Sequence, residues 1–263
     1  MSFALLLGFT GLLDGELWYD FCMETEYKND FEKFLVHTNE KRILLKEITK
    51  EIKKLKTESL LDIGAGNGLL ATPLSKEVSR YLAIEPKLSF VEKLKSNGLD
   101  VVQSNFPVSI SEKFDLILSS HSLSYDKENF EPFIREAFNL LNQNGVFLII
   151  TYRGQEDDWN NLLDFVGKKK MDYNRMIFNS IIELLNNLGN VTIRKVITKV
   201  TTDNLDDMIQ ALSFVFSDGK PEKKEKFLGY KVKLEKFLNS KYKIEHGYSF
   251  PFQHFFIMTQ KTK

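Results

Sequence analysis

A glycine-rich turn that follows a short apolar run is the feature that most limits how this chain can fold. The run Leu60–Ile63 is apolar apart from Asp62, and glycines stand at positions 64, 66 and 68 immediately after it. Glycine lets a chain leave a strand in a tight turn and lets a ligand approach the backbone closely. A helix that begins after such a turn points its free N–H groups into the same space. The pattern predicts a buried strand, a ligand-binding loop and a helix.

Apolar runs and helical periodicities alternate through the first 152 residues. The predicted strands are 59–63, 81–85, 100–103, 114–119 and 146–152, and the predicted helices are 31–55, 69–78, 87–96 and 128–142. Inside the first helix, Thr38 and Asn39 are typical of a cap that begins a new turn, with Glu40 as its first acid. Buried strands that alternate with helices indicate βαβ units and a parallel sheet covered on both faces.

The regular alternation of predicted strands and helices ends after residue 152. Helices are predicted at 158–169 and 174–188, a strand at 191–200, a lysine-rich helical stretch at 203–240 and an aromatic strand at 252–259. We expect the last strand to join the sheet antiparallel, with residues 203–240 inserted over one end. The predicted organisation is an N-terminal helical lid (1–56), a ligand-binding core (57–200), and the insertion with the final strand (201–263) in the same domain.

Composition excludes several classes of protein. The 36 Lys and Arg residues balance 36 Asp and Glu, so a broad nucleic-acid surface is not expected. No run reaches the roughly 18 apolar residues of a membrane helix, and the apolar start lacks the basic flank of a signal peptide, so we expect no membrane association. The one cysteine, Cys22, excludes an intramolecular disulfide and a Cys-rich zinc site, which predicts a cytoplasmic location.

Four short motifs follow one another across residues 59–152. They are the Asp62/Gly64/Gly66/Gly68 loop, Glu85 at the end of the second strand, Phe114–Ser120, and Leu140–Ile149. Together they resemble the motifs of the class I S-adenosylmethionine-dependent methyltransferases. A doubly wound fold whose glycines bind nothing is an alternative, as is a nicotinamide-dependent oxidoreductase, although the third and fourth motifs fit the latter less well.

The resemblance implies a Rossmann-like α/β fold. Its features are a seven-stranded, mostly parallel sheet with helices on both faces, an N-terminal helical lid and a helical insertion before the last strand. It also implies S-adenosylmethionine as cofactor and S-adenosylhomocysteine as product. No metal is expected, because Asp126, Glu128, Asp157 and Asp158 form no recognisable ligand pattern.

The cofactor contacts follow from the same resemblance. Gly64 and Gly66 should flank the methionine part, Asp62 should reach its ammonium through water, and Glu85 should accept ribose hydroxyls. Ser104 and Asn105 stand where the family contacts adenine, and Ser120 stands beside the reactive sulfonium. The complete predicted set is Tyr27, Asp62, Gly64, Ala65, Gly66, Glu85, Pro86, Ser104, Asn105 and Ser120.

A second resemblance is to the histamine N-methyltransferase family. It rests on the stretch from Tyr27 to Glu40, on Leu123 and Tyr125, on Gly154 and Trp159, on Leu188–Gly189, and on the helical insertion. In that family the acid matching Glu40 holds the polar nitrogen end of the substrate, and the tyrosine matching Tyr27 helps to cover the cofactor. This chain has His121 where that family has a glutamine, and Ser124 where it has a tyrosine.

These patterns predict methyl transfer to a nitrogen of a small amine or imidazole-type acceptor. His121 follows the fourth strand at the ligand-binding edge of the sheet, where an imidazole can accept a proton, and Glu40 can orient the acceptor. The predicted catalytic residues are therefore His121 and Glu40, and the predicted substrate contacts are Phe31, Glu40, His121, Tyr125 and Trp159.

Other interpretations stay open at this point. Glu40 is equally typical of a helix-dipole partner, and the aromatic residues are equally typical of core or lid packing. The alternative functions are a protein or RNA methyltransferase and a non-catalytic module that binds the cofactor. We expect a monomer or a weak homodimer.

Overall fold

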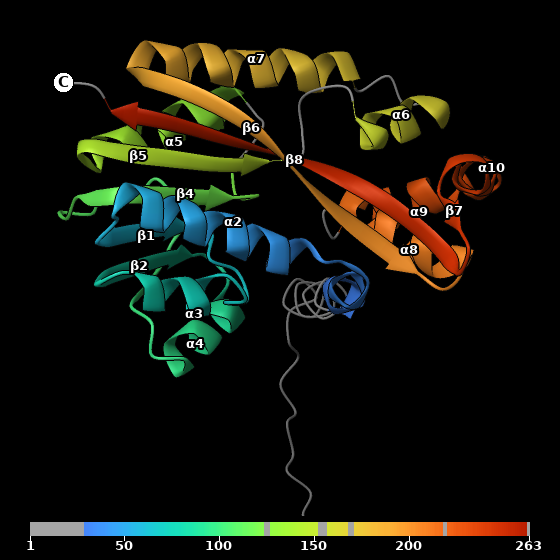
Figure 1. The fold of residues 1–263 in the computed structure, drawn as a ribbon, viewed down its shortest axis with the longest axis horizontal. Coiled ribbons are helices and arrows are strands. Elements are labelled where there is room, and N and C mark those ends of the chain that lie inside the picture. The colour runs from blue at the N-terminus through green and yellow to red at the C-terminus, as the bar shows by residue number, and fades with distance from the viewer. Residues whose placement is uncertain (1–28, 124–126, 152–156, 168–170, 218–219, 262–263) are drawn as a thin grey trace, which may run out of the picture.

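One mixed sheet organises the molecule (Figure 1). The computed structural model describes residues 29–123, 127–151, 157–167, 171–217 and 220–261. The strands are β1 (Ser59–Ile63), β2 (Arg80–Glu85), β3 (Val101–Gln103), β4 (Phe114–Ser120), β5 (Leu141–Thr151), β6 (Gly189–Thr202), β7 (Lys243–Ile244) and β8 (Gly247–Lys261). They lie in the order β3-β2-β1-β4-β5-β8-β6, and β7 pairs with β8.

The strand directions confirm the predicted fold. All pairs among β1 to β5 are parallel, whereas β8 is antiparallel to both β5 and β6. The seven-strand path is therefore the predicted, mostly parallel sheet, and the last strand joins it antiparallel as expected. The two-residue β7 is an additional strand that the sequence pattern did not indicate.

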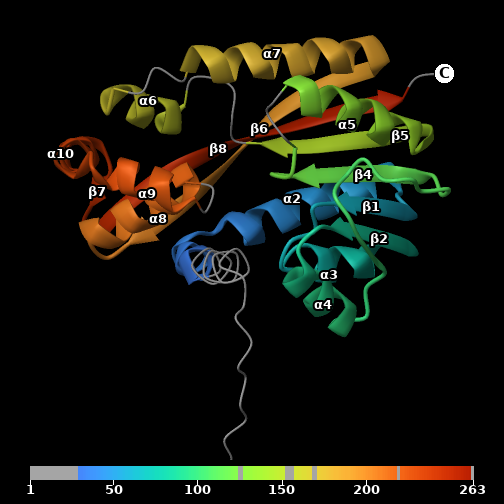
Figure 2. The same cartoon turned by 180° about the vertical axis from the view of Figure 1, so that it is seen from behind.

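Helices cover both faces of the sheet (Figures 1 and 2). They are α2 (Glu40–Leu55), α3 (Ala71–Leu74), α4 (Leu88–Ser96), α5 (Lys127–Asn139), α6 (Asp158–Phe165), α7 (Met171–Leu188), α8 (Leu205–Ser217), α9 (Pro221–Leu228) and α10 (Lys231–Lys241). Residues 29–37 are also helical, and a 3-10 turn, Ser75–Glu77, follows α3. Helices α2, α3 and α4 pack on one face, and α5 and α7 pack on the other. No helix in the ranges just given has both the length and the apolar character needed to cross a membrane.

Helix α2 packs directly on one face of the sheet. Leu44, Ile48 and Ile52 recur every four residues, which places them on one helix face, and all three are buried against the strands. Burying side chains of this size contributes roughly 1.5–3 kcal/mol each. We expected residues 1–56 to form one lid, but α2 packs as part of the core because of this apolar face.

The start of α2 is fixed to the edge strand β6. Thr38 forms an antiparallel bridge with Val200. The N–H of Asn39 donates to the carbonyl of Lys199 at 3.1 Å, and the N–H of Lys199 donates to Oδ1 of Asn39 at 2.8 Å. Because these residues bond to a strand, the helix predicted over 31–55 is interrupted at Thr38 and Asn39, and α2 begins at Glu40 beside β6.

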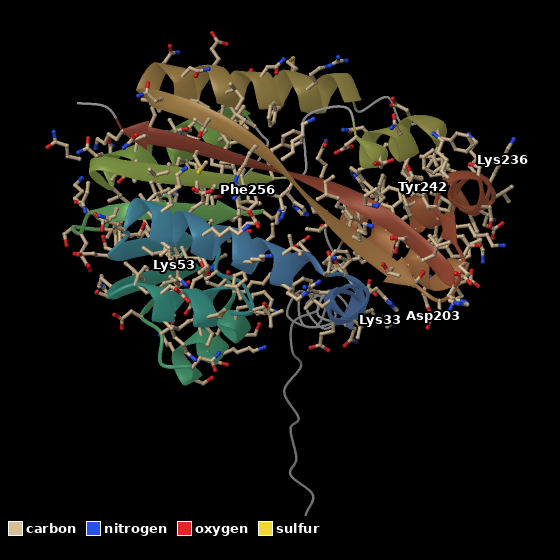
Figure 3. All side chains as sticks on the ribbon, in the orientation of Figure 1. Lys33, Lys53, Asp203, Lys236, Tyr242 and Phe256 are labelled. Atoms are coloured by element: carbon tan, nitrogen blue, oxygen red, sulfur yellow. The ribbon has the colours of Figure 1, made fainter. Side chains whose placement is uncertain are left out.

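Strands β6 and β8 extend beyond the rest of the sheet. They pair from Gly189 opposite Lys261 to Thr202 opposite Tyr248, whereas β5 pairs only with residues 255–260 of β8. The free halves of the two strands carry α6, α8, α9 and α10, which we call the second lobe (Figure 1). Figure 3 shows Tyr242 in this lobe, well apart from Phe256 in the half of β8 that lies within the sheet. The predicted insertion is present as three helices.

Candidate active site

The glycine loop after β1 has two distinct kinds of glycine. Gly64 and Gly66 have φ values of +77° and +59°, which disfavour other residues. A Cβ at Gly64 would lie 2.3 Å from Cβ of Ser122, whereas a Cβ at Gly66 would meet nothing within 4 Å. Gly64 is therefore required for packing, and Gly66 leaves an open backbone surface that a ligand can approach.

Glu85 closes the loop from the end of β2. Its side chain is only 5% exposed, and it accepts the N–H of Gly66 on Oε2 at 2.8 Å and the N–H of Lys87 on Oε1 at 3.0 Å. A carboxylate has about four acceptor positions, so these two bonds leave capacity for a ligand hydroxyl.

Asp62 lies inside β1, where it is buried. The hydroxyl of Tyr81 donates to it at 2.7 Å. Burial raises the pKa of Asp62 to about 6, with a smaller contribution from the charge of Glu85, while the bond from Tyr81 and the charge of Lys41 oppose the rise. A cation bound close to Asp62 would favour its ionised form. No role was predicted for Tyr81, which the sequence pattern placed only at the start of the second strand.

A cavity of about 880 Å³ joins the glycine loop to the start of α2. Twelve of the predicted site residues line it: Phe31, Glu40, Asp62, Gly64, Ala65, Gly66, Glu85, Pro86, Ser104, Asn105, Ser120 and His121. The structure thus brings together residues from the loops after β1, β2, β3 and β4 with two helical segments that precede the sheet. Tyr27 and Tyr125, which were also predicted, lie outside the described residues.

Trp159 does not line the cavity, contrary to the predicted substrate contact. It is buried in the second lobe, with its ring 5.5 Å from that of Phe252 and 6.4 Å from that of Phe227. Phe252 itself lines the cavity. Trp159 therefore lies one layer behind the wall, because α6 packs its apolar face on β8.

Glu40 and Lys41 form an ion pair in the lining of the cavity. Nζ of Lys41 lies 3.0 Å from Oε1 of Glu40, which is 8% exposed. Burial raises the pKa of Glu40, but the charges of Lys41, His121 and His254 outweigh it and lower the pKa to about 2. Glu40 is thus ionised at neutral pH. Sequence reasoning missed Lys41 because the resemblance gave a role only to the acid.

Two histidines meet beside Glu40. His121 has a φ of +59°, and its backbone N–H donates to the carbonyl of Ile150 at 3.0 Å. Its ring packs edge-on against that of His254, with the centroids 5.1 Å apart. His254 is fully buried on β8, where burial lowers its pKa, and its Nε2 lies 2.7 Å from Oγ1 of Thr198. His254 was missed because it stands within an aromatic strand; the only signal was a histidine among apolar neighbours.

Comparison with known proteins identifies the family. Residues 36–188, more than half of the chain, match a family model described as a methyltransferase domain. The chain belongs to the class I S-adenosylmethionine-dependent methyltransferases. This confirms the fold and the enzyme class that the four sequence motifs predicted.

Relatives of this methyltransferase include two ubiquinone biosynthesis O-methyltransferases. The protein from Pelagibacter ubique is 32% identical over 106 residues, which are 38% of this chain and 44% of that protein. The protein from Rickettsia canadensis is 26% identical over 161 residues, which are 56% of this chain and 68% of that protein. The match thus spans less than half the length of the first of these relatives.

A solved structure has the same fold over nearly the whole methyltransferase. It is an S-adenosylmethionine-dependent methyltransferase of Thermotoga maritima, described as a possible histamine N-methyltransferase. Its TM-score is 0.51 at 15% identity, and the likeness covers 92% of this chain and 98% of that one.

Proposed function

We propose that this methyltransferase transfers a methyl group from S-adenosylmethionine to a small-molecule acceptor. The observation that carries the proposal is that one cavity of about 880 Å³ is lined both by the glycine loop and by Glu40 and His121. Its volume falls in the range of small-molecule sites, and it is lined by charged and polar side chains together with phenylalanines. A protein or RNA acceptor would need a broad surface around the cavity, and the zero net charge of the chain does not favour RNA.

The residues around the glycine loop fit the cofactor. The open backbone at Gly66 gives close access, Glu85 would accept ribose hydroxyls, and Asp62 would face the ammonium group. Ser104 and Asn105 line the same cavity and would contact the adenine. The cofactor supplies an electrophilic methyl group on a sulfonium. Ser120, at the end of β4, would lie near the reacting atoms.

The part of the cavity beside Glu40 and His121 would hold the acceptor. The ionised carboxylate of Glu40 would orient a polar or cationic group through a charge-assisted hydrogen bond. A protonated amine has no lone pair for attack, so His121 would remove its proton. Phe31, Phe34 and Phe214 form an aromatic wall there that excludes water and that can stabilise a cationic product. These features favour a nitrogen of an amine or imidazole-type compound.

An oxygen acceptor is the second candidate. It is supported by the two relatives described as ubiquinone biosynthesis O-methyltransferases. The same residues would serve it, since His121 would take the proton of a hydroxyl group and Glu40 would orient the ring that carries it.

The experiment is transfer of labelled methyl groups from S-adenosylmethionine to a panel of amines, imidazoles, phenols and catechols, with a protein mixture and RNA as further arms. Product formation with small molecules and not with the macromolecules is the expected result. Labelling of protein or RNA alone would overturn the proposal. Tight binding of S-adenosylhomocysteine without transfer in any arm would favour a non-catalytic binding module.

A further inference from the structure

Three side chains from distant parts of the sequence converge beside the cavity. Glu40 begins α2, His121 follows β4, and His254 lies in β8. One potential ligand atom from each lies within 4.8 Å of those of the other two. Glu40 and His254 are buried, and His121 is partly exposed.

We infer that Glu40, His121 and His254 form a binding site for a divalent transition metal, with Zn²⁺ as the best match. Two imidazoles and one carboxylate are a common donor set of zinc sites that keep a position open for water or substrate. Bonds of this kind would place the ligand atoms about 3.4 Å apart. Each side chain would therefore move by about 1 Å or less from its present position to close on the metal.

The second observation concerns the orientation of His254. Its Nε2 is bonded to Oγ1 of Thr198, while its Nδ1 is buried and has no hydrogen-bond partner in the part of the chain that the structure describes. A buried polar atom without a partner is costly in a protein interior. Ligation of a metal would satisfy Nδ1, and Thr198 would act as the outer partner that metal-binding histidines usually have.

The other two ligands are also held in place. The N–H of Asn39 is bonded to β6, which fixes the start of α2 and hence Glu40. His121 is in the left-handed region of backbone conformation, which is a strained arrangement of a kind that clusters at functional sites. Lys41 pairs with Oε1 of Glu40, so Oε2 is the oxygen that can face the metal.

The open positions of the metal would face the acceptor. Glu40 and His121 line the cavity, whereas His254 lies behind its wall. An amine that binds zinc through its one lone pair cannot attack a methyl group with it, whereas a hydroxyl oxygen retains a further lone pair. With a metal bound, the site would therefore favour an oxygen acceptor, the second candidate of the proposed function, and this part of the inference rests on that proposed function.

The test of metal binding does not depend on turnover. The full-length protein, treated with a chelator and desalted, is titrated with Zn²⁺ against a chromophoric competitor, and with Co²⁺ to record the absorption spectrum of the bound ion. We expect one site per chain. His254→Gln and Glu40→Gln should each weaken Zn²⁺ binding more than about 100-fold, and Thr198→Val should weaken it about 10- to 100-fold.

Three control substitutions distinguish the loss of a metal ligand from a general loss of folding. His246→Gln changes a histidine whose side chain is 89% exposed, and Glu47→Gln changes an acid of α2 that pairs with Lys50 and Arg194. Thr259→Val changes a buried β8 threonine whose hydroxyl has no partner among the described residues. These three controls should bind Zn²⁺ as the wild type does. Binding of S-adenosylhomocysteine by every variant would establish that each is folded.

The inference is wrong if the wild type binds Zn²⁺ no more tightly than the Glu40 and His254 variants do. If a wild type without specific Zn²⁺ binding still transfers methyl groups, the metal site is wrong but the proposed function stands. Failure of the metal site can therefore be distinguished from failure of the proposed function. If Zn²⁺ binds as expected, phenols or catechols should be methylated faster than amines, and removal of the metal should lower that rate. Faster methylation of amines by the zinc-loaded protein would overturn the assignment of the acceptor.

Discussion

Oε2 of Glu85 accepts the backbone N–H of Gly66 at 2.8 Å, so the acid at the end of β2 and the open glycine of the β1 loop are one unit. The residue that would bind ribose therefore also holds the loop in the shape that admits the cofactor. Its second oxygen is tied to the N–H of Lys87, which fixes the direction of the carboxylate.

Glu85→Ala should weaken binding of S-adenosylhomocysteine about 30- to 150-fold, because charge-assisted hydrogen bonds worth roughly 2–3 kcal/mol are lost. Glu85→Gln keeps the size of the side chain and one carbonyl acceptor, so its loss should be smaller. Calorimetric titration measures both. Equal affinity of Glu85→Ala and the wild type would remove Glu85 from the cofactor site.

Gly64→Ala and Gly66→Ala should have different effects, although both glycines have positive φ. The new Cβ at position 64 would overlap Ser122, so we expect loss of stability on the order of 2–3 kcal/mol. At position 66 nothing lies within 4 Å, so the cost in stability should be about 1 kcal/mol. Cofactor affinity should fall clearly, because the methyl group occupies the space of the ligand. Melting curves and titrations on the two variants would show whether the effects separate in this way.

The stability of the free enzyme should depend on the protonation of Asp62. Its pKa rises from 3.8 in the unfolded chain to about 6 in the fold, so the folded state holds the proton more tightly between these values. The free energy of unfolding should therefore fall as pH rises from about 4 to about 6, by on the order of 3 kcal/mol, and stay level above that. Asp62→Asn should lack this contribution, and chemical denaturation at several pH values would measure the difference.

Burial raises the pKa of Asp157 to about 6 as well. Asp157 is present in both the wild type and Asp62→Asn, so its effect on the free energy of unfolding cancels when the two are compared. Cofactor affinity provides a second check, because the ionised form of Asp62 attracts an ammonium group. Affinity of the wild type should rise between pH 5 and 7. A parallel rise in Asp62→Asn would assign the dependence to another group.

Glu40→Gln should lower the rate of methyl transfer about 10- to 100-fold while cofactor affinity stays within a factor of about two. If Glu40 only complements the dipole of α2, the variant would instead lose about 0.3–1 kcal/mol of stability and keep full activity. Steady-state kinetics and melting temperatures distinguish the two roles. Glu47→Gln is the control, because Glu47 lies in the same helix and is also ion-paired.

In the metal-free enzyme, where no metal occupies the imidazole of His121, His121→Ala should slow transfer and change the dependence of the rate on pH. A base that accepts a proton makes the rate rise with pH through the range in which imidazoles titrate. Glu40 ionises near pH 2 and cannot cause such a rise. A pH–rate profile of unchanged shape in the variant would indicate that His121 contacts the acceptor without taking its proton.

The convergence of the residues proposed to bind the cofactor could be predicted from the sequence because its determinants are local. The glycines directly follow β1, and Glu85 ends β2, so the parallel order of the strands alone brings them to one edge. Ten of the twelve predicted residues that line the cavity come from these strands and the loops that follow them.

The acceptor half could be predicted only in part. Glu40 and His121 were found through a resemblance and through the position of strand four. His254 and Thr198 meet because of the register between β6 and β8, a pairing of residues more than fifty positions apart that periodicity does not specify. Trp159 was predicted to contact the substrate, but it lies behind the lining of the cavity. The sequence could not show this, because the packing of α6 on β8 decides which aromatic ring lines the cavity.

Strands β6 and β8 have a consequence for how enzymes of this shape diversify. Thr202 lies opposite Tyr248, so the segment between them leaves and re-enters the protein at neighbouring points. Residues 203–246 thus form one continuous insertion at the tip of the β6–β8 ribbon, and its helices share an apolar core with α6 and with both strands. Exchange of this insertion would remodel the acceptor wall at Phe214 and leave the strands that bind the cofactor uncut. A change in this segment alone would therefore alter the proposed acceptor wall while the proposed cofactor site keeps its strands.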